Sequence, residues 1–450
     1  MRTSLDILDL AQGGEGVGRS ADGRPVFVPF TAPGDRVEVD LPGGGGPAHA
    51  ALARLQHAGP ARVAPPCRHF GPGEGAERMC GGCEWLHLDY GAQLAAKERA
   101  FAETLRRIGR LEPGSYRLAP IVRSPLALRY RARAKFHLDR RTGRLVFFRR
   151  RSHEPVQLAE CHLLAAELDA LREAAGPALA AAGLEAREVA LEWSAHQGRA
   201  AAYVQLAAVT PAARRRAEAL LAAMPALAGV VLGAEGAPPA VVGDPVLRHE
   251  RRPGDAAGGL QRSRPDVFQQ ANRGANALLV AAALELLQPD GEDVLELYCG
   301  AGNFTGPLAA RARSVDAVEG QGPALELARL DASDGEVARR AGPALAGGGH
   351  VRFLAGDALA VARGLAQERG PSVRPYRAAL LDPPRQGAPA VGAVLRELGV
   401  PRVVYVSCDP ATLARDLRAC REAGYKVEAV QPVDMFPQTH HVEAVALLAR

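Results

Sequence analysis

The chain has 450 residues, of which 47% are hydrophobic and 23% are charged, as is typical of a globular protein with two or three domains. Its first residues, MRTSLDILDLAQGG, lack the basic and long apolar regions of a secretory signal, and no run approaches the roughly 18 apolar residues of a membrane span. We therefore expect a cytoplasmic protein without a membrane partner, and we expect it to act as a monomer.

The charge balance weakly favours a polyanionic partner, because the net charge is +5 and the isoelectric point is near 8.9. Only Lys97, Lys135 and Lys426 are lysines among 55 basic residues. Such a preference for arginine over lysine is typical of a bias in the composition of the genome, so a single arginine indicates little about function. The chain has seven cysteines, which is not an even number, and we expect it to be cytoplasmic. For both reasons we expect no disulfide framework.

Residues 1–58 are predicted to form a small β-barrel. The short strands SLDILDLA, RPVFVPF and DRVEVDL are separated by the glycine-rich turns GGEGVG, DG and APGD. The segment GEGVGR…GRPVFVPFTAPGDRVEV resembles the TRAM domain, an RNA-binding barrel of the OB type. The resemblance implies a groove for single-stranded nucleic acid, and a purely structural β cap is the alternative.

Residues 59–262 are predicted to form a mixed α+β domain that carries four cysteines of interest. Cys80-Gly-Gly-Cys83 can place two sulfurs on one metal, and two distant cysteines, Cys67 and Cys161, would complete a set of four thiolates. Thiolates select zinc or an iron–sulfur cluster, and the spacing does not separate the two; a metal-free role is the third alternative. Cys420 is expected to be filler in a helix.

The segments around these cysteines resemble a known iron–sulfur site. CRHFG…CGGCEWLHLDYGAQLAAK and SHEPVQLAECHLL are similar to the cluster segment of the 23S rRNA members of the RNA uracil-5-methyltransferases. The resemblance implies a [4Fe–4S] cluster bound by the four cysteines. The 12 residues between Cys67 and Cys80 exceed the gap that is usual in the family, and GPGEGAER is typical of an inserted polar loop.

Residues 123–151 are strongly basic, with 11 basic residues against one acid, Asp139. A hairpin is predicted at residues 141–143. Before it, basic residues recur at every second position, which on a strand places them on one face. They are Arg129, Arg131, Arg133 and Lys135. This spacing favours a surface that follows RNA phosphates, and an ordinary solvated face is the alternative.

From residue 263 onward, strands and helices alternate as in a doubly wound α/β sheet. The apolar runs DVLELY, SVDAVEG, VRFLAGDA, RAALLDPP and RVVYVSCDP are separated by helical segments. Two further strands, KVEAVQPVD and HVEAVALLA, leave no room for a helix between them and are predicted to pair antiparallel.

Polar residues collect after successive strands of this predicted sheet. The glycine turn from Gly300 to Gly306 has the spacing G-x-G-x-x-x-G, which differs from that of pyrophosphate binders. Glu319, 17 residues beyond Gly302, can accept hydrogen bonds from ribose hydroxyls, and Asp357 and Asp382 follow the next strands. Helix caps and turn formers could explain each residue singly, but the set favours S-adenosylmethionine.

The strand RVVYVS ends at Cys408, and the last strand begins with the acid Glu443. A helix that starts after Asp409-Pro410 could favour a thiolate, whereas Asp409 would oppose it. A thiolate and a carboxylate beside a methyl donor suit methylation of uracil C5: addition of sulfur to C6 makes C5 nucleophilic, and a base must later remove the C5 proton.

The C-terminal motifs resemble those of the RNA uracil-5-methyltransferases. FQQAN from Phe268, LELYCGAGNF, DPPR, VSCDP and DMFPQTHHVE occur in the family's order over residues 263–450. The resemblance implies a Rossmann-like class I methyltransferase domain with Cys408 as nucleophile and Glu443 as base. It also implies six cofactor-binding positions, namely Gln270, Tyr298, Asn303, Glu319, Asp357 and Asp382. Gln269 stands where an aromatic residue is common, and Asp409 where Asn is frequent.

Together these features predict a three-part enzyme that makes 5-methyluridine in 23S rRNA: a TRAM barrel (1–58), a central iron–sulfur and RNA-binding domain (59–262) and a methyltransferase domain (263–450). A tRNA uracil-5-methyltransferase is the nearest alternative. A non-catalytic RNA-binding factor would not need Cys408 and Glu443, and an amino-methyltransferase that uses the DPP loop would not need Cys408.

Overall fold

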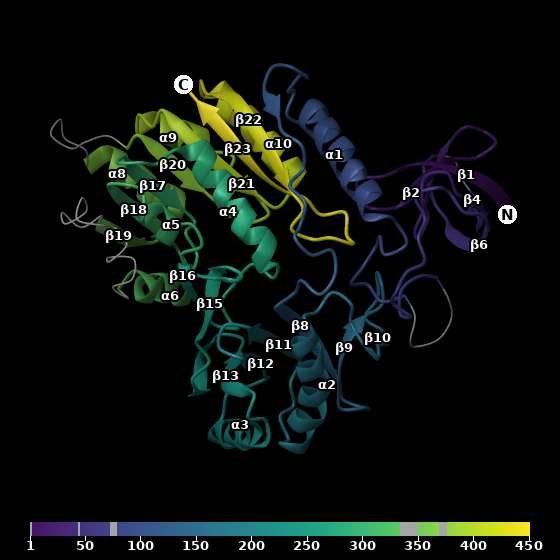
Figure 1. Cartoon of the computed structure of the whole chain (residues 1–450), viewed down its shortest axis with the longest axis horizontal. Helices are drawn as coiled ribbons and strands as arrows, with labels where there is room; N and C mark the ends of the chain where they lie inside the picture. The colour runs from purple at the N-terminus through teal and green to yellow at the C-terminus, as the bar shows by residue number, and fades with distance from the viewer. Residues whose placement is uncertain (1, 44–45, 73–78, 334–349, 369–375) are drawn as a thin grey trace.

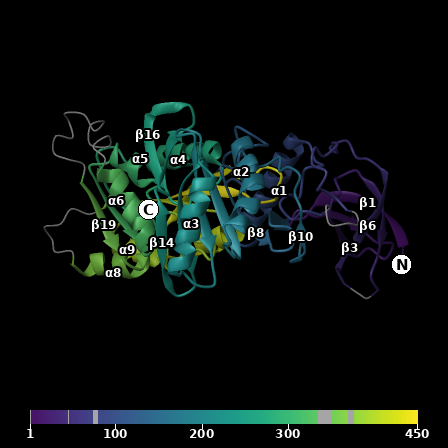
Figure 2. The same ribbon diagram turned by 90° about the horizontal axis from the view of Figure 1, so that it is seen from below.

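The computed structural model describes residues 2–43, 46–72, 79–333, 350–368 and 376–450. Three large sheets follow one another along the chain, and a two-stranded hairpin lies between the second and the third (Figure 1). Turned by 90°, the molecule is elongated, with β1 (Arg2–Leu10) and β19 (His350–Ala355) near opposite ends (Figure 2). In the described part of the chain, no helix is long and apolar enough to cross a membrane.

The first sheet confirms the predicted all-β N-terminal region. Its strand order is β5-β3-β2-β1-β4-β6, so β1 lies at its centre and pairs antiparallel with both β2 and β4. Alternate residues of β1, such as Leu5 and Ile7, are buried because successive side chains of a strand point to opposite faces. The other strands are β2 (Gly16–Arg19), β3 (Pro25–Val28), β4 (Arg36–Asp40), β5 (Ala48–His49) and β6 (Ala51–His57).

The second sheet has the order β10-β9-β8-β11-β12-β13-β14, and helices α2 and α3 pack on it. The predicted hairpin is confirmed, since His137 pairs with Val146 and Asp139 with Arg144. The elements are β8 (Arg133–Asp139), β9 (Arg144–Phe148), β10 (Pro155–Val156), α2 (Ala166–Ala181), β11 (Glu188–Ser194), β12 (Arg199–Gln205), α3 (Pro211–Ala223), β13 (Leu227–Ala234) and β14 (Ala237–Gly243).

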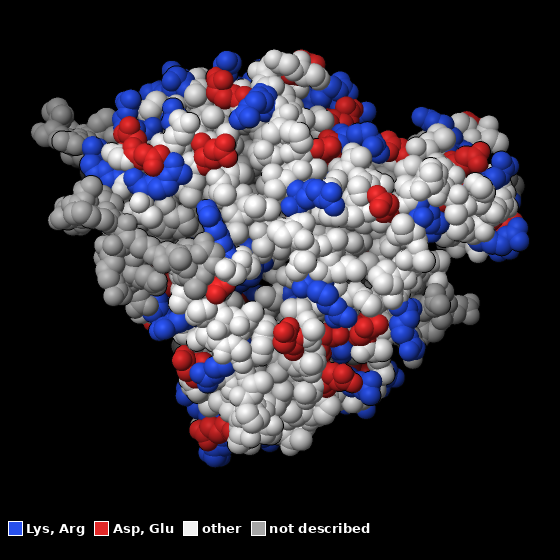
Figure 3. Space-filling model, in the orientation of Figure 1, with Lys and Arg blue, Asp and Glu red and all other residues white. Residues whose placement is uncertain are grey.

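The predicted one-sided basic face is wrong. The strand begins only at Arg133, and Arg129 lies outside it with a left-handed φ of 57°. Arg131 lines the cavity of the four cysteines, and Arg133 donates hydrogen bonds to the carbonyls of Pro265 and Val267. Only Lys135 of the four is exposed. On the face shown in Figure 3, basic side chains are interspersed with acidic ones.

A buried ionic network joins the second sheet to the C-terminal region at Glu192, whose side chain is 1% exposed. Glu192 lies 2.9 Å from Arg273 of α4 (Arg273–Leu287), 3.1 Å from His249 of β15 (Leu247–Arg252) and 3.6 Å from Arg133. Burial opposes ionisation of Glu192, but the hydrogen bond from His249 and the charge of Arg133 hold its pKa well below its usual range. One carboxylate thus compensates two arginines from different parts of the fold.

The third sheet has the order β19-β18-β17-β20-β21-β23-β22-β7. Its first five strands are parallel, and β23 is antiparallel to both neighbours, which confirms the predicted doubly wound sheet and the antiparallel final pair. The strands are β7 (Arg117–Leu118), β17 (Asp293–Leu297), β18 (Ser314–Glu319), β20 (Ala378–Leu381), β21 (Arg402–Ser407), β22 (Lys426–Val433) and β23 (Glu443–Ala449).

Helices cover both faces of the third sheet, in two separate apolar cores. One core contains residues of α1, α8, α9 and α10, and the other contains residues of α4, α5 and α6. Helix α1 and strand β7 precede the second sheet in the chain. They nevertheless pack against α10 and β22, which follow the second sheet by more than a hundred residues. The helices are α1 (Tyr90–Arg107), α5 (Thr305–Ala309), α6 (Gly322–Ser333), α8 (Ala358–Glu368), α9 (Val391–Glu397) and α10 (Pro410–Glu422).

Replacing Glu192 by Gln should lower the free energy of unfolding by about 3–5 kcal/mol, because it leaves buried arginine charges uncompensated. The matched control is Glu188→Gln on the same strand, which breaks an exposed pair with Lys135 and should cost about 0–1 kcal/mol. Chemical denaturation measures both values. Because the pKa of Glu192 is depressed, the contribution of Glu192 to the free energy of unfolding is complete above about pH 4.3 and should be lost as the pH falls further. Equal costs for the two variants would contradict this account.

Candidate active site

Cys408 and Glu443 meet across two antiparallel strands at one edge of the third sheet. The register of β21 and β23 pairs Val406 with Val445 and Ser407 with Ala444. Continued by one residue, it sets Cys408 opposite Glu443. Directly opposed residues of such strands have Cα atoms about 4.5–5.5 Å apart. The sheet therefore brings a thiol and a buried carboxyl together.

The same edge carries four of the residues predicted to bind a cofactor. Because β17, β18, β19, β20 and β21 are parallel, their carboxyl ends lie side by side. Each of the first four strands ends at or just before one of these residues: Tyr298, Glu319, Asp357 and Asp382. Ligands of open α/β sheets bind at this edge.

The glycine turn after β17 leaves its backbone open to a ligand. Gly300 and Gly302 have φ values of 54° and 82°, which a residue with a side chain rarely adopts. A Cβ atom on Gly300 would meet nothing within 4 Å. The carboxylate of Glu319 accepts hydrogen bonds from the N–H groups of Gly300, at 2.9 Å, and Gln321, at 2.7 Å. Turn and acid thus form one unit.

The two remaining predicted cofactor residues, Gln270 and Asn303, differ in their hydrogen bonds. Gln270 has a buried side-chain oxygen without a hydrogen-bond partner, so it needs a donor that the described residues do not supply. Asn303 exchanges two amide hydrogen bonds, of 2.8 and 3.0 Å, with Asn276. Asn272 of the same sequence motif has a structural role instead: it caps α4 and donates to the carbonyl of Met435.

The protein groups around Cys408 do not activate its thiol. Burial and the charges of Glu443 and Asp382 raise its pKa to about 11. The carboxylate of Asp409 occupies the start of α10, where it accepts hydrogen bonds from the N–H groups of Ala411 and Thr412. The possible gain in acidity from the helix dipole does not outweigh these effects.

The surroundings of Glu443 favour its neutral form. Burial and the charge of Asp382 raise its pKa to about 8, and burial raises the pKa of Asp382 to about 7. Arg385 opposes the rise for both Cys408 and Glu443. No role for Arg385 was predicted from the sequence, although its place in DPPR, directly after the strand end that carries Asp382, was an available signal.

The four cysteines of the predicted metal site line one small cavity of about 70 Å³: Cys67, Cys80, Cys83 and Cys161. Burial raises the pKa of each thiol, and the guanidinium of Arg131, which also lines the cavity, opposes this for all but Cys67. Among the described residues, no three His, Cys, Asp or Glu side chains are grouped so as to hold one metal ion. Cys420, as predicted, is buried in the apolar core.

A second cavity, of about 410 Å³, lies between the hairpin of β15 and β16 (Asp255–Ser263) and helices α4 and α5, and neither Cys408 nor Glu443 lines it. Four arginines line it, namely Arg248, Arg251, Arg252 and Arg262. Asn303 borders it, whereas the other predicted site residues do not. The strand-edge chemistry therefore locates the candidate active site, and cavity size does not.

Comparison with solved structures identifies the class of fold. A tRNA (uracil-54, C5)-methyltransferase from Pyrococcus abyssi, solved with S-adenosyl-L-homocysteine, matches all of this chain and all of its own with a TM-score of 0.70 and 22% identity. The TRAM domain model matches residues 4–41. The fold is that of a methyltransferase preceded by a TRAM domain.

Comparison of sequences then identifies the family. The family model for tRNA (Uracil-5-)-methyltransferase matches residues 259–450. Proteins named 23S rRNA (uracil(1939)-C(5))-methyltransferase RlmD from Pseudomonas entomophila and Thiobacillus denitrificans are each 35% identical to this chain. The alignments cover 95% of this chain and 89% of the first relative, and 100% of this chain and of the second. The chain belongs to the RlmD family of 23S rRNA uracil-C5-methyltransferases.

Replacing Arg385 by Gln should raise the pKa of Cys408, because the arginine charge favours the thiolate. We expect the pH midpoint of Cys408 alkylation by iodoacetamide, followed by mass spectrometry, to rise by roughly half a unit, since solvent screens the exposed arginine. Arg418→Gln, which removes an exposed ion pair with Glu422 on α10, is the control and should leave the midpoint unchanged. A midpoint that does not move in Arg385→Gln would contradict the electrostatic role.

Proposed function

We propose that this protein transfers a methyl group from S-adenosylmethionine to C5 of a uridine in 23S rRNA, the uridine that corresponds to the one its relatives' name specifies. The observation that carries the proposal is the pairing of Cys408 with Glu443 at the strand edge where the candidate cofactor residues collect. An amino-methyltransferase would have no use for this pair, and neither would a non-catalytic RNA-binding factor.

The cofactor site is supported by the chemistry of its donors. Glu319 offers carboxylate oxygens for ribose hydroxyls, Gln270 has an unsatisfied buried oxygen, and the backbone at Gly300 is open to close approach. We assign cofactor binding to Gln270, Tyr298, Asn303, Glu319, Asp357 and Asp382. S-adenosylmethionine would supply an electrophilic methyl group and a positive sulfonium charge.

In the proposed reaction, Cys408 gives up its proton to solvent and its Sγ forms a bond to C6 of the uracil. The π electrons of the C5–C6 bond move toward the C4 carbonyl, which makes C5 nucleophilic enough to take the methyl group; the bond from that methyl group to the sulfonium sulfur would break, and the rest of the cofactor would leave as a neutral thioether. C5 then carries both the methyl group and its original proton. Glu443, once ionised, removes that proton, the C5–C6 double bond forms again, and the bond from Sγ to C6 breaks.

Access to C5 and C6 requires a uracil that is unstacked or flipped out of folded RNA. The TRAM barrel and the central domain are the candidate RNA-binding parts, and we propose domain limits of 1–58, 59–262 and 263–450. We further propose that the protein acts as a cytoplasmic monomer.

Mapping 5-methyluridine in rRNA and tRNA from cells that lack the protein separates the two RNA classes: loss from tRNA alone would favour the tRNA alternative.

Glu443→Gln should still attack the RNA and transfer the methyl group but should then stall as a covalent protein–RNA adduct, because no base removes the C5 proton. Denaturing electrophoresis with a labelled 23S rRNA fragment measures the adduct. Cys408→Ala and the double variant should form neither adduct nor product while S-adenosylmethionine still binds. Normal turnover by Cys408→Ala would overturn the nucleophile assignment, and free turnover by Glu443→Gln would overturn the assignment of the base.

We also propose that the four cysteines bind a [4Fe–4S] cluster. The four thiols line one cavity, Arg131 beside them would offset the negative charge of the thiolates, and the segments around them resemble an iron–sulfur segment. We assign the cluster to Cys67, Cys80, Cys83 and Cys161. Bound there, it would cross-link segments that lie far apart in the chain.

Protein purified without oxygen should contain about four irons and acid-labile sulfide, with a brown charge-transfer absorbance. Cys80→Ser and Cys83→Ser should lose the iron and lower the melting temperature. Cys420→Ser, which alters a cysteine of the apolar core, is the control and should keep the iron. Stoichiometric zinc without sulfide would overturn the assignment.

A further inference from the structure

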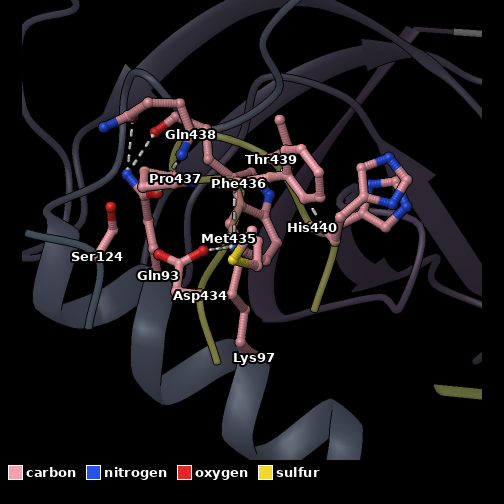
Figure 4. Close-up of polar contacts among 12 residues, drawn as sticks. Gln93, Lys97, Ser124, Asp434, Met435, Phe436, Pro437, Gln438, Thr439 and His440 are labelled. Atoms are coloured by element: carbon pink, nitrogen blue, oxygen red, sulfur yellow. Dashed lines mark hydrogen bonds and ion pairs between the residues drawn. The ribbon is translucent and has the colours of Figure 1, made fainter. Parts of the chain in front are cut away.

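The nine residues that connect β22 to β23, residues 434–442, end directly at Glu443, and we refer to them as the base loop. The loop is well packed: Asp434 and Met435 are fully buried, and Gln438 and Thr439 are 6% exposed. Figure 4 shows Asp434 and Gln438 of this loop beside Lys97 and Gln93 of helix α1. One carboxyl oxygen of Glu443 is buried without a hydrogen-bond partner. The position of that carboxyl therefore depends on the backbone that carries it.

Helix α1 holds the start of the base loop through a fully buried ion pair. Lys97 Nζ lies 2.6 Å from Asp434 Oδ1, both side chains are 0% exposed, and Nζ also donates to the carbonyl of Phe436 at 3.1 Å. The hydroxyl of Tyr90 donates to the other oxygen of Asp434 at 2.9 Å. A buried pair with these additional hydrogen bonds permits little displacement.

Helix α1 also holds the middle of the loop, through Gln93. Its amide donates to the side-chain oxygen of Gln438 at 2.9 Å and accepts from the Gln438 backbone N–H at 3.0 Å. The same amide nitrogen also lies within hydrogen-bonding distance of the carbonyl oxygens of Trp85 and Leu88, at 3.1 and 3.0 Å, so its two N–H groups are shared among three acceptors. Gln438 has a φ of 70°, a left-handed conformation that is strained for a residue with a side chain and persists only when its surroundings enforce it.

The far side of the loop is tied to the cysteine segment. The backbone N–H groups of Glu84 and Trp85 both donate to the carbonyl of Gln438, at 2.9 and 3.1 Å. The carboxylate of Glu84 accepts from the N–H of His440 at 3.0 Å. Since Glu84 follows Cys83 directly, the base loop lies between α1 and the segment that carries two of the four thiols.

We propose that Gln93 and Lys97 are positioning residues for the removal of the C5 proton: they fix the base loop, and the loop fixes the carboxyl of Glu443 beside Cys408. The proposal rests on the roles assigned to Cys408 and Glu443. Because Cys408 lies at the end of β21, outside the loop, a loosened loop should affect release of the RNA more than attack on it.

Single-turnover kinetics of Gln93→Ala with a labelled 23S rRNA fragment test this. Adduct formation should stay within about threefold of wild type, whereas adduct release should slow at least about tenfold, so that a covalent complex accumulates. Gln431→Ala is the matched control, since Gln431 of β22 donates to the carbonyl of Pro120 and lies outside the loop; it should behave like wild type. A merely structural role would slow formation and release together.

A paired variant guards against simple unfolding. Lys97→Met combined with Asp434→Asn removes both charges together, leaves no lone buried ion, and should also accumulate adduct. If Glu443→Gln traps the RNA while Gln93→Ala and the paired variant release it like wild type, the positioning proposal fails and the proposed function stands. If Glu443→Gln releases the RNA freely, the assignment of the base has failed instead.

Discussion

The chemistry of this protein depends on one strand that runs against its neighbours. β23 is antiparallel and lies between β21 and β22, so its first residue reaches the edge where the parallel strands end. A parallel strand at that place would carry its first residue to the opposite edge. The antiparallel direction therefore places a carboxyl beside the terminal thiol of β21, and no loop has to fold back over the site to supply it.

The surroundings of this pair favour neutral groups until charged ligands arrive. The carboxyl of Glu443 is buried, the thiol of Cys408 is partly buried, and Asp382 adds further negative charge nearby. Arg385 is the cation that works against both effects. A cysteine that is held as a thiol takes part in fewer unwanted reactions, while the positive charge of the proposed cofactor would favour its ionisation.

Much of the fold could be predicted from local pattern, because the alternation of strands with helices and the residues after each strand are read directly from the sequence. The basic run around Arg131 could not. Its period of two is the same whether a guanidinium meets solvent, lines a cavity with cysteines, or, as for Arg133, meets the buried Glu192. Likewise, no local signal in α1 predicts its contacts with the last strands, and the pKa values follow from burial that only the assembled sheet creates.

The placement of β23 also bears on how the molecule is made. Lys97 and Asp434 are 337 residues apart in the chain, and the final strand must enter between two strands that are synthesised before it. Contacts of such long sequence separation form late and slowly. A nascent chain therefore exposes the edges of β21 and β22 until residues 443–449 have emerged from the ribosome, so the strand that carries Glu443 is the latest of the three to take its place.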